Sequence, residues 1–249
     1  MSVLERNVAA LRSAYWIVLL SGFVEPVFYL LSIGVGVGGL VGDLTLADGR
    51  VVEYAVFVAP AMLASAAMSG ALSETTFNFF GKMKHMKLYD GVLATPVRPF
   101  ELALGELCWA MVRGSLYSAA FLVVMVTMDL TTPLRALAAL PAAILVGFAF
   151  GGLGMALSSF MRSWQDFDLM GSAQFALFLF SGTFVPAERY PVVLRWLVEV
   201  TPLYRAVDLI RGITAGAGGH PWLDLAYLIA VAVLGLMVAA RRVGKVLTP

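Results

Sequence analysis

Long apolar runs alternate with short polar stretches along the whole chain. Six of these runs approach or exceed the roughly 20 mainly apolar residues that a membrane-crossing helix needs. They cover residues 14–40, 54–77, 102–128, 133–160, 168–186 and 221–240. The first contains Glu25-Pro26, where proline should bend the helix, and the fifth is the shortest. The pattern predicts an all-α membrane protein with six transmembrane helices and a single domain over residues 1–249.

Two further segments have apolar residues at helical spacing but do not read as spans. Residues 1–12 predict an amphipathic helix that lies in the membrane interface and leads into the first span. Residues 187–212 carry seven charged side chains, and each charge at the bilayer centre costs about 2.5–3.5 kcal/mol on insertion scales. Pro191 and Pro202 divide this second segment. It therefore predicts two short helices at the outer leaflet, before the last span.

The composition places the chain among integral membrane proteins. It is 60% hydrophobic with a mean hydropathy of +0.87, and only 13% of its residues are charged, against about 25% in soluble domains. The net charge of +1 does not point to a nucleic-acid partner, and we expect none. Cys108 is the single cysteine, so no disulfide within the chain contributes to the fold.

The distribution of lysine and arginine predicts the orientation. Ten of these residues fall on the side that holds both termini, residues 79–100 and Arg162, and six fall on the other side. Since cytoplasmic loops carry the excess of positive charge, both termini and the 79–100 loop are expected in the cytoplasm. Thirteen arginines against four lysines, with abundant alanine and glycine, suggest a high-GC bacterial genome. The expected location is therefore the bacterial inner membrane.

The sequence offers no catalytic or cofactor-binding motif. GVGVGG at 34–39 fits the spacing of a dinucleotide-binding loop, but it lies at the end of a membrane span instead of after a strand. Glycines 34, 38 and 42 have the spacing that lets membrane helices approach closely. No G-x-x-x-x-G-K-[ST] loop is present, and the two histidines lie far apart. We expect neither catalytic residues nor a bound cofactor or metal in this chain.

Four charged residues lie in or near the predicted spans, where ionisable groups are by default functional candidates. They are Glu25, Glu74, Glu106 and Arg113. Glu106 and Arg113 are seven residues apart and share a helix face. The alternatives are a structural pair between helices, or a hydrated position of Glu106 at the cytoplasmic interface. For Glu25, a carboxylate facing another helix at the proline kink is the simpler interpretation.

The layout resembles the permease subunit of type-2 ABC exporters over essentially the whole chain. The most specific stretch is FLFSGTFVPAERYPVVLRWLVEVTPLYRAVDLIRG at 178–212, which is similar to that family's signature. FVEPVFYLLSIGVGVG and KLYDGVLATPVRPFELALGEL resemble the branch of nodulation-factor (lipooligosaccharide) and daunorubicin-resistance exporters. The resemblance implies a cytoplasmic coupling helix after span two and a helical pair at the external gate.

The resemblance also implies roles for particular residues. The coupling loop 79–100 would contact an ATP-binding subunit through Lys82, Lys84, Met86, Lys87, Leu88, Tyr89 and Asp90. Among these, Leu88 and Tyr89 are the expected apolar anchors. The external gate would include Phe184, Pro186, Pro191, Trp196, Pro202, Arg205, Asp208 and Arg211.

The resulting hypothesis is a permease that exports an amphipathic lipid-linked, glycolipid, oligosaccharide or drug-like substrate. A separate ATPase subunit, present in two copies, would hold ATP and magnesium, and a second permease copy would complete a homodimer or heterodimer in contact with membrane lipids. The alternative is an ion-coupled secondary transporter or channel without an ATPase partner, which the charges in the spans permit although no inverted repeat is visible.

Overall fold

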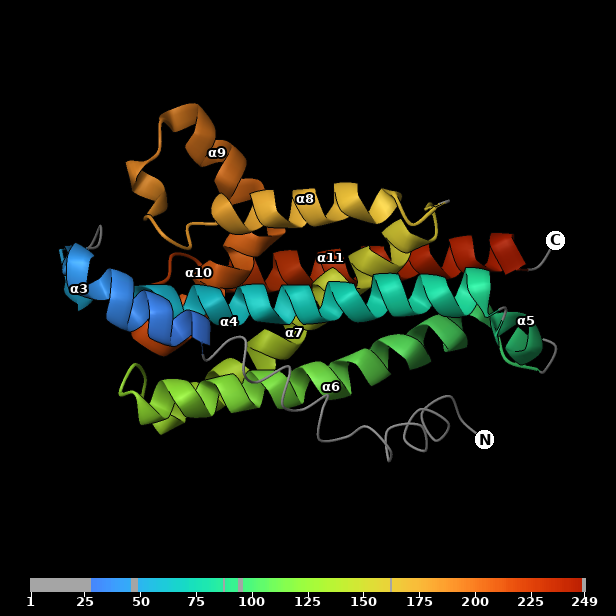
Figure 1. Ribbon diagram of the computed structural model, residues 1–249, viewed down its shortest axis with the longest axis horizontal. Coiled ribbons are helices and arrows are strands. Elements are labelled where there is room, and N and C mark those ends of the chain that lie inside the picture. The colour runs from blue at the N-terminus through green and yellow to red at the C-terminus, as the bar shows by residue number, and fades with distance from the viewer. Residues whose placement is uncertain (1–27, 46–48, 87, 94–95, 162, 248–249) are drawn as a thin grey trace.

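The computed structural model describes residues 28–45, 49–86, 88–93, 96–161 and 163–247, and most of these residues are helical (Figure 1). The long helices lie side by side along the longest axis of the molecule. The predicted interfacial helix 1–12, half of the first span with Glu25, and Lys87 lie outside the described residues.

The longest helices correspond to four of the predicted spans. Four helices in the described part of the chain are long and apolar enough to cross a membrane: Tyr54–Lys84, Pro99–Thr127, Pro133–Ser158 and Pro221–Arg242. The first of them combines α4 (Tyr54–Ser73) with two π-helical segments, η2 (Glu74–Asn78) and η3 (Gly81–His85). The other three are α6 (Pro99–Thr127), α7 (Pro133–Ser158) and α11 (Pro221–Leu247).

The fifth predicted span is shorter than expected. Over 168–186 the chain is helical only as far as Leu179, in α8 (Asp166–Leu179), and it then turns through the SGTFVP stretch. A helix of 14 residues extends about 21 Å, whereas the hydrocarbon core of a bilayer is about 30 Å thick. The structure therefore supports the all-α membrane class but does not confirm the count of six spans.

A small hairpin interrupts the helical architecture after the first predicted span. The helix that contains η1 (Ser32–Val37) and α3 (Gly38–Val41) ends at Gly42, whose φ of 70° is a left-handed value that glycine adopts without strain. Antiparallel strands β1 (Asp43–Thr45) and β2 (Val51–Glu53) follow, with Leu44 opposite Val52. They bring the chain directly into α4.

Helix α7 lies at the centre of the bundle and contacts α4, α6, α10 (Pro202–Ala215) and α11. Its closest approach is to α11, where Gly152 and Gly235 face each other. A Cβ on Gly235 would lie 2.6 Å from the carbonyl carbon of Gly152. The two backbones therefore meet directly at this crossing, as small residues allow in membrane bundles.

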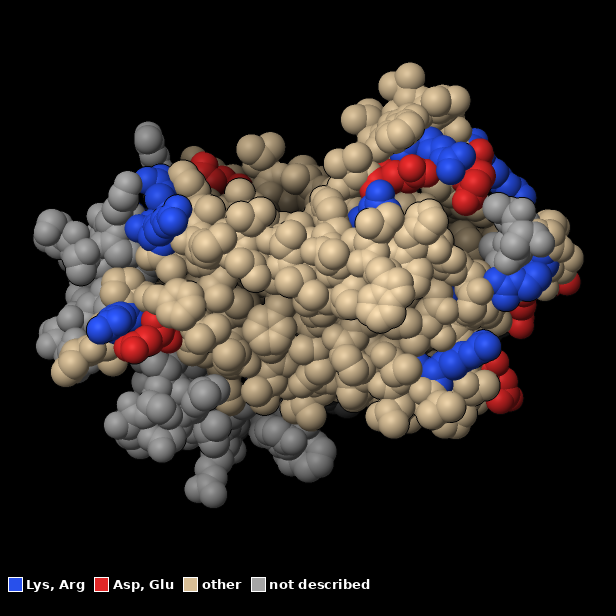
Figure 2. All heavy atoms as spheres, turned by 180° about the vertical axis from the view of Figure 1, so that it is seen from behind, with Lys and Arg blue, Asp and Glu red and all other residues tan. Residues whose placement is uncertain are grey.

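The surface charge pattern fits a membrane protein. Figure 2 shows lysine, arginine and carboxylate side chains gathered toward the two ends of the molecule, with a broad band of other residues between them. One end, the α5 end, carries α5 (Leu88–Leu93), and the other, the α9 end, carries α9 (Val192–Val200).

Candidate functional site

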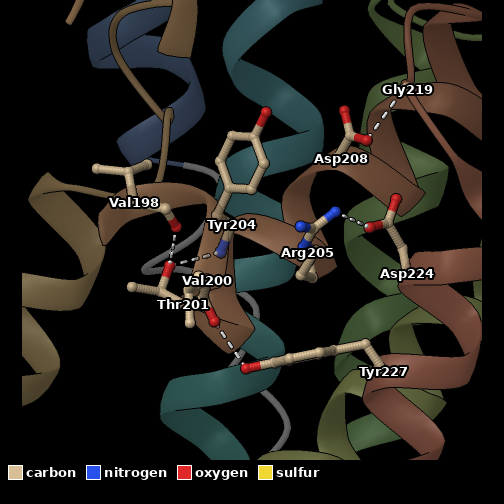
Figure 3. Close-up of polar contacts among 9 residues, drawn as sticks. All are labelled: Val198, Val200, Thr201, Tyr204, Arg205, Asp208, Gly219, Asp224 and Tyr227. Carbon is tan, nitrogen blue, oxygen red and sulfur yellow. Dashed lines mark hydrogen bonds and ion pairs between the residues drawn. The ribbon is translucent and has the colours of Figure 1, made fainter. Parts of the chain in front are cut away.

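A network of polar contacts joins α9, α10 and α11 at the α9 end (Figure 3). Thr201 separates the two short helices and caps the second, since its hydroxyl accepts a hydrogen bond from the Tyr204 backbone N–H at 3.3 Å. Pro202 takes the first helical position of α10, where its missing N–H is harmless. The Tyr227 hydroxyl of α11 donates to the Val200 carbonyl at 2.7 Å. The turn between α9 and α10 is thereby attached to the last span.

Charged side chains strengthen this attachment. Arg205 of α10 lies 3.1 Å from Asp224 of α11, and the Asp224 side chain is fully buried. Asp208 accepts a hydrogen bond from the Gly219 backbone N–H at 2.9 Å, which closes the loop between α10 and α11. The 187–212 segment is thus held against the bundle by α10, and α9 projects from it (Figure 1).

Arg211 joins α10 to two other parts of the chain. Its Nε donates to the Phe57 carbonyl of α4 at 3.2 Å, its Nη2 donates to the Gly182 carbonyl at 2.9 Å, and its guanidinium lies 3.9 Å from the Phe57 ring centroid. Pro60 lies in the same turn of α4 and lacks the N–H that would bond the Val56 carbonyl, so Arg211 binds α4 beside an interruption of its hydrogen-bond ladder.

Burial changes the acid–base properties of two side chains in α10. It lowers the pKa of Arg211 to about 10, which still leaves the guanidinium protonated at neutral pH. It raises the pKa of Tyr204 to about 12, so the phenol stays neutral. Arg211 is therefore a buried cation bound chiefly by carbonyl oxygens and an aromatic ring.

The remaining residues expected at the gate lie in the connecting turns and on α9. Phe184 packs edge-on against Phe178 of α8, with ring centroids 5.2 Å apart. Pro186 and Pro191 directly precede η4 (Ala187–Arg189) and α9. Trp196 is 67% exposed and belongs to an apolar face of α9 that is open to the surroundings. That face comprises Val192, Val193, Trp196, Leu197 and Val200.

The charged side chains of α9 pair with each other, whereas those of α10 contact neighbouring parts of the chain. Arg195 and Glu199 form an ion pair at 2.6 Å. Arg205, Asp208 and Arg211 follow one another at three-residue spacing along α10. Arg205 and Asp208 both interact with Asp224 of α11, and Asp208 also accepts a hydrogen bond from the following loop. Arg211 contacts α4 and the SGTFVP turn.

The charged residues flagged in the spans form two ion pairs between neighbouring helices. Arg113 of α6 lies 2.8 Å from Glu74 of η2, and Lys82 of η3 lies 2.6 Å from Glu106 of α6. The Glu106 side chain is 7% exposed. Glu106 and Arg113 share a face as predicted, but each pairs with the preceding helix. This supports the interpretation of these two charges as structural pairs between helices.

At the α5 end, the structure corrects part of the expected coupling surface. The helix that begins at Tyr54 continues to Lys84, so Lys82 and Lys84 lie on the end of a span instead of in a loop. Lys82 is engaged with Glu106. Tyr89, an expected anchor for a partner, is fully buried and its ring centroid lies 5.2 Å from that of Phe79.

Two apolar side chains remain accessible on the expected coupling surface. Met86 is 71% exposed and Leu88 is 36% exposed, and Lys84 is exposed beside them. Asp90 lies within α5, two residues after Leu88. The accessible apolar part of this surface is therefore formed by Met86 and Leu88, while Tyr89 holds α5 against the bundle.

Several residues of these networks were not expected from the sequence. Asp224 is a carboxylate in the first turn of an otherwise apolar span, and that position was a sufficient signal. Arg50 and Arg135 carried no signal in the pattern. The structure shows them at the end of α10, where Arg50 donates to the Gly216 carbonyl at 2.7 Å and Arg135 lies near Thr214. Cations suit this C-terminal end of a helix dipole.

Comparisons with known proteins place these features in context. The family model described as ABC-2 type transporter matches residues 1–214. Nodulation protein J of Rhizobium leguminosarum bv. trifolii is 34% identical over 225 residues, which cover 90% of this chain and 83% of that protein. Nodulation protein J of Rhizobium meliloti is 29% identical over 250 residues, which cover 100% of this chain and 94% of that protein.

Proposed function

Because the chain belongs to the ABC-2 type transporter family and is a membrane permease, we propose that it exports an amphipathic, lipid-linked saccharide with energy from a separate ATPase subunit. The α5 end supports the proposed ATPase partner. There the short helix α5 follows the span Tyr54–Lys84, and Met86 and Leu88 are exposed at its beginning. Apolar side chains exposed beyond a membrane span fit a protein partner, since water does not satisfy them.

The substrate class rests on the relatives. The chain resembles the branch of nodulation-factor exporters, and the similar proteins bear the name Nodulation protein J. A saccharide with an acyl chain combines hydroxyl and amide groups with an apolar tail. We propose that such molecules enter between two permease copies from the cytoplasm or the inner leaflet, and leave past α9 and α10.

The partners follow from the same proposal. Two copies of the ATPase subunit would bind ATP and magnesium, and two copies of the permease would form the pathway. An ion-coupled transporter was favoured only by the charges within spans. Three of those charges are engaged in the pairs Glu74–Arg113 and Lys82–Glu106, so the contacts account for them without an ion pathway.

We predict that the exposed apolar pair at the α5 end binds the ATPase subunit. Met86→Ala combined with Leu88→Ala should weaken co-purification of the ATPase about 30-fold, because truncating a buried anchor costs about 2 kcal/mol or more. Lys84→Ala should weaken it by about fivefold at most and only at low salt, since exposed ion pairs contribute about 0–1 kcal/mol. Substrate-stimulated ATP hydrolysis by the complex provides the second readout.

Leu134→Ala is the matched control for this experiment. Leu134 is 78% exposed at the beginning of α7, where the neighbouring Arg135 contacts α10, and its substitution should affect neither assembly nor hydrolysis. If the Met86 and Leu88 double variant retains the ATPase while Lys84→Ala loses it at every salt concentration, the contact is electrostatic and our account of this surface fails.

We also predict that 187–212 does not cross the membrane. Helix α9 has 9 residues, about 14 Å of helix, which is less than half of the hydrocarbon thickness. Cysteines placed at Val192 and Trp222, which are 72% and 81% exposed, should both react with an impermeant reagent from outside the cell. Cys108→Ala provides the background. Reaction of the two positions from opposite sides would contradict the proposed topology.

A further inference from the structure

Helix α8 lies along α4 and meets it at two separate points (Figure 1). Phe167 of α8 stacks on Phe77 with ring centroids 4.3 Å apart, and Gln174 of α8 donates from Nε2 to the Ser69 hydroxyl at 2.7 Å. Moving seven residues forward on α8 corresponds to moving eight residues back along the α4 helix. The two helices are therefore antiparallel, and they form a seam.

The seam is held together weakly. Phe167 is the only buried residue of the described helix α8, and large apolar side chains such as Leu169 and Phe175 are 77% and 62% exposed. Most residues of α4 are buried by contrast. Since helices in a membrane associate through close packing and hydrogen bonds between them, the sparse contacts of α8 let it separate from α4 at a lower free-energy cost than α6, α7 or α11 would from one another.

Gln174 brings hydrogen-bonding capacity into this otherwise apolar seam. Its amide group holds two donor hydrogens and one acceptor oxygen. Among the described residues, Ser69 is the hydrogen-bond partner that it contacts. An unused donor and an acceptor therefore remain beside a helix that packs loosely.

Ser65 adds an unusual hydroxyl one turn along α4 from Ser69. It is 7% exposed, and its Oγ is buried with no hydrogen-bond partner among the described residues. Thr75 and Thr76, near the other end of the same helix, donate to the carbonyls of Ala71 and Leu72 instead. A buried hydroxyl without a partner is unfavourable and calls for an explanation such as a bound molecule. Four-residue spacing places Ser65 and Ser69 on the same face.

We propose that Ser65, Ser69 and Gln174 form a polar subsite that binds the hydroxyl or amide groups of an amphipathic saccharide when α8 moves away from α4. The exposed apolar side chains of α8 receive the acyl chain. This inference rests on the proposed substrate class. It identifies residues that would favour saccharide-bearing molecules over other hydrophobic molecules. A purely apolar seam would accept any hydrophobic molecule, whereas three hydrogen-bonding groups favour a molecule that satisfies them.

The test measures binding to the full-length permease in lipid nanodiscs, without the ATPase. One fluorescent probe is a tetrasaccharide with a hexadecyl chain, and the other carries the same chain on a trimethylammonium group, which neither donates nor accepts hydrogen bonds. Ser65→Ala and Gln174→Leu should each weaken the saccharide probe about 3- to 10-fold and leave the ammonium probe unchanged. Ser65→Ala should also leave thermal stability unchanged, because its hydroxyl makes no bond within the described chain.

Ser172→Ala is the matched control, since this α8 hydroxyl already donates to the Asp168 carbonyl at 2.9 Å. It should not affect either probe. Unchanged saccharide affinity in Ser65→Ala and Gln174→Leu, or an equal loss for both probes, would overturn the subsite. If the wild-type permease does not bind the saccharide probe but still assembles with the ATPase, the subsite is refuted and the proposal of ATP-driven export is retained. Saccharide binding that depends on Ser65 and Gln174 in a permease that retains no ATPase would support the subsite and refute the energy source.

Discussion

Lys82→Met is expected to lower the free energy of unfolding by about 1–3 kcal/mol, less than the roughly 3–5 kcal/mol lost when a fully buried ion pair is broken, because Lys82 is 24% exposed. The methionine keeps the apolar stem of the lysine but removes the ammonium group that lies 2.6 Å from Glu106, whose side chain is 7% exposed. Glu106→Leu should destabilise the protein less, because Lys82 is 24% exposed and its long side chain reaches water. Unfolding by SDS titration in mixed micelles measures both.

The double variant Lys82→Met/Glu106→Leu should recover most of the lost stability, since two apolar side chains replace a partly buried ion pair at little or no net cost. Lys84→Met is the control, because Lys84 is an exposed lysine two residues away. Equal losses for Lys84→Met and Lys82→Met would mean that general surface charge, and not the contact with Glu106, stabilises the helix end.

Gly235→Ala is expected to destabilise the bundle by about 1–3 kcal/mol through overpacking. The added Cβ would lie 2.6 Å from the carbonyl carbon of Gly152 and 2.7 Å from the Leu153 nitrogen. Both are backbone atoms that cannot rotate away, so α7 and α11 must move apart. Alanine is otherwise the better helix former by about 0.8–1 kcal/mol. The steric contact is therefore the reason that we expect Gly235→Ala to destabilise the protein.

Gly114→Ala provides the matched comparison. Gly114 lies within α6, and no atom outside its own turn lies within 4 Å of a Cβ placed there. The substitution should leave stability unchanged or raise it by up to about 1 kcal/mol. A Gly235→Ala protein as stable as the wild type, measured by the same SDS titration, would show that the helices tolerate a wider crossing.

The apolar runs predicted the long helices well because hydrophobic length is a local property of the chain. α6, α7 and α11 begin within three residues of the predicted spans. The two short helices within 187–212 could also be predicted from the sequence, since prolines and charges mark the ends of short helices. α8 was overestimated because apolar composition continues through the SGTFVP turn, where Gly182 adopts a φ of 68° and the helix has already ended.

Contacts between helices were much harder to predict from the sequence. Glu74, Glu106 and Arg113 were correctly flagged as unusual, but spacing along one helix says nothing of a partner on the next. Tyr89 was expected to face a partner because it is aromatic and follows lysines, and the structure turns it inward onto Phe79.

The glycines also show that spacing along one helix does not identify the contact with another helix. Gly38 was expected to allow a close helix approach, yet the nearest atom to a Cβ there is the Ile33 carbonyl oxygen of its own segment, at 3.6 Å. The close crossing lies at Gly152 and Gly235 instead. Spacing identifies where an approach is possible, and the partner helix decides where it occurs.

The two ion pairs between α6 and the helix that begins with α4 run in opposite senses, and this has a consequence for biosynthesis. Glu74 faces Arg113, while eight residues later Lys82 faces Glu106. Sliding one helix by two turns would set Glu74 against Glu106, or Lys82 against Arg113, and like charges would repel. The first helix leaves the ribosome before α6, so Glu74 and Lys82 gain these partners only when α6 arrives. Both pairs of opposite charges form in one alignment of the two helices only, so the charges favour a single register of the hairpin while the chain is being inserted.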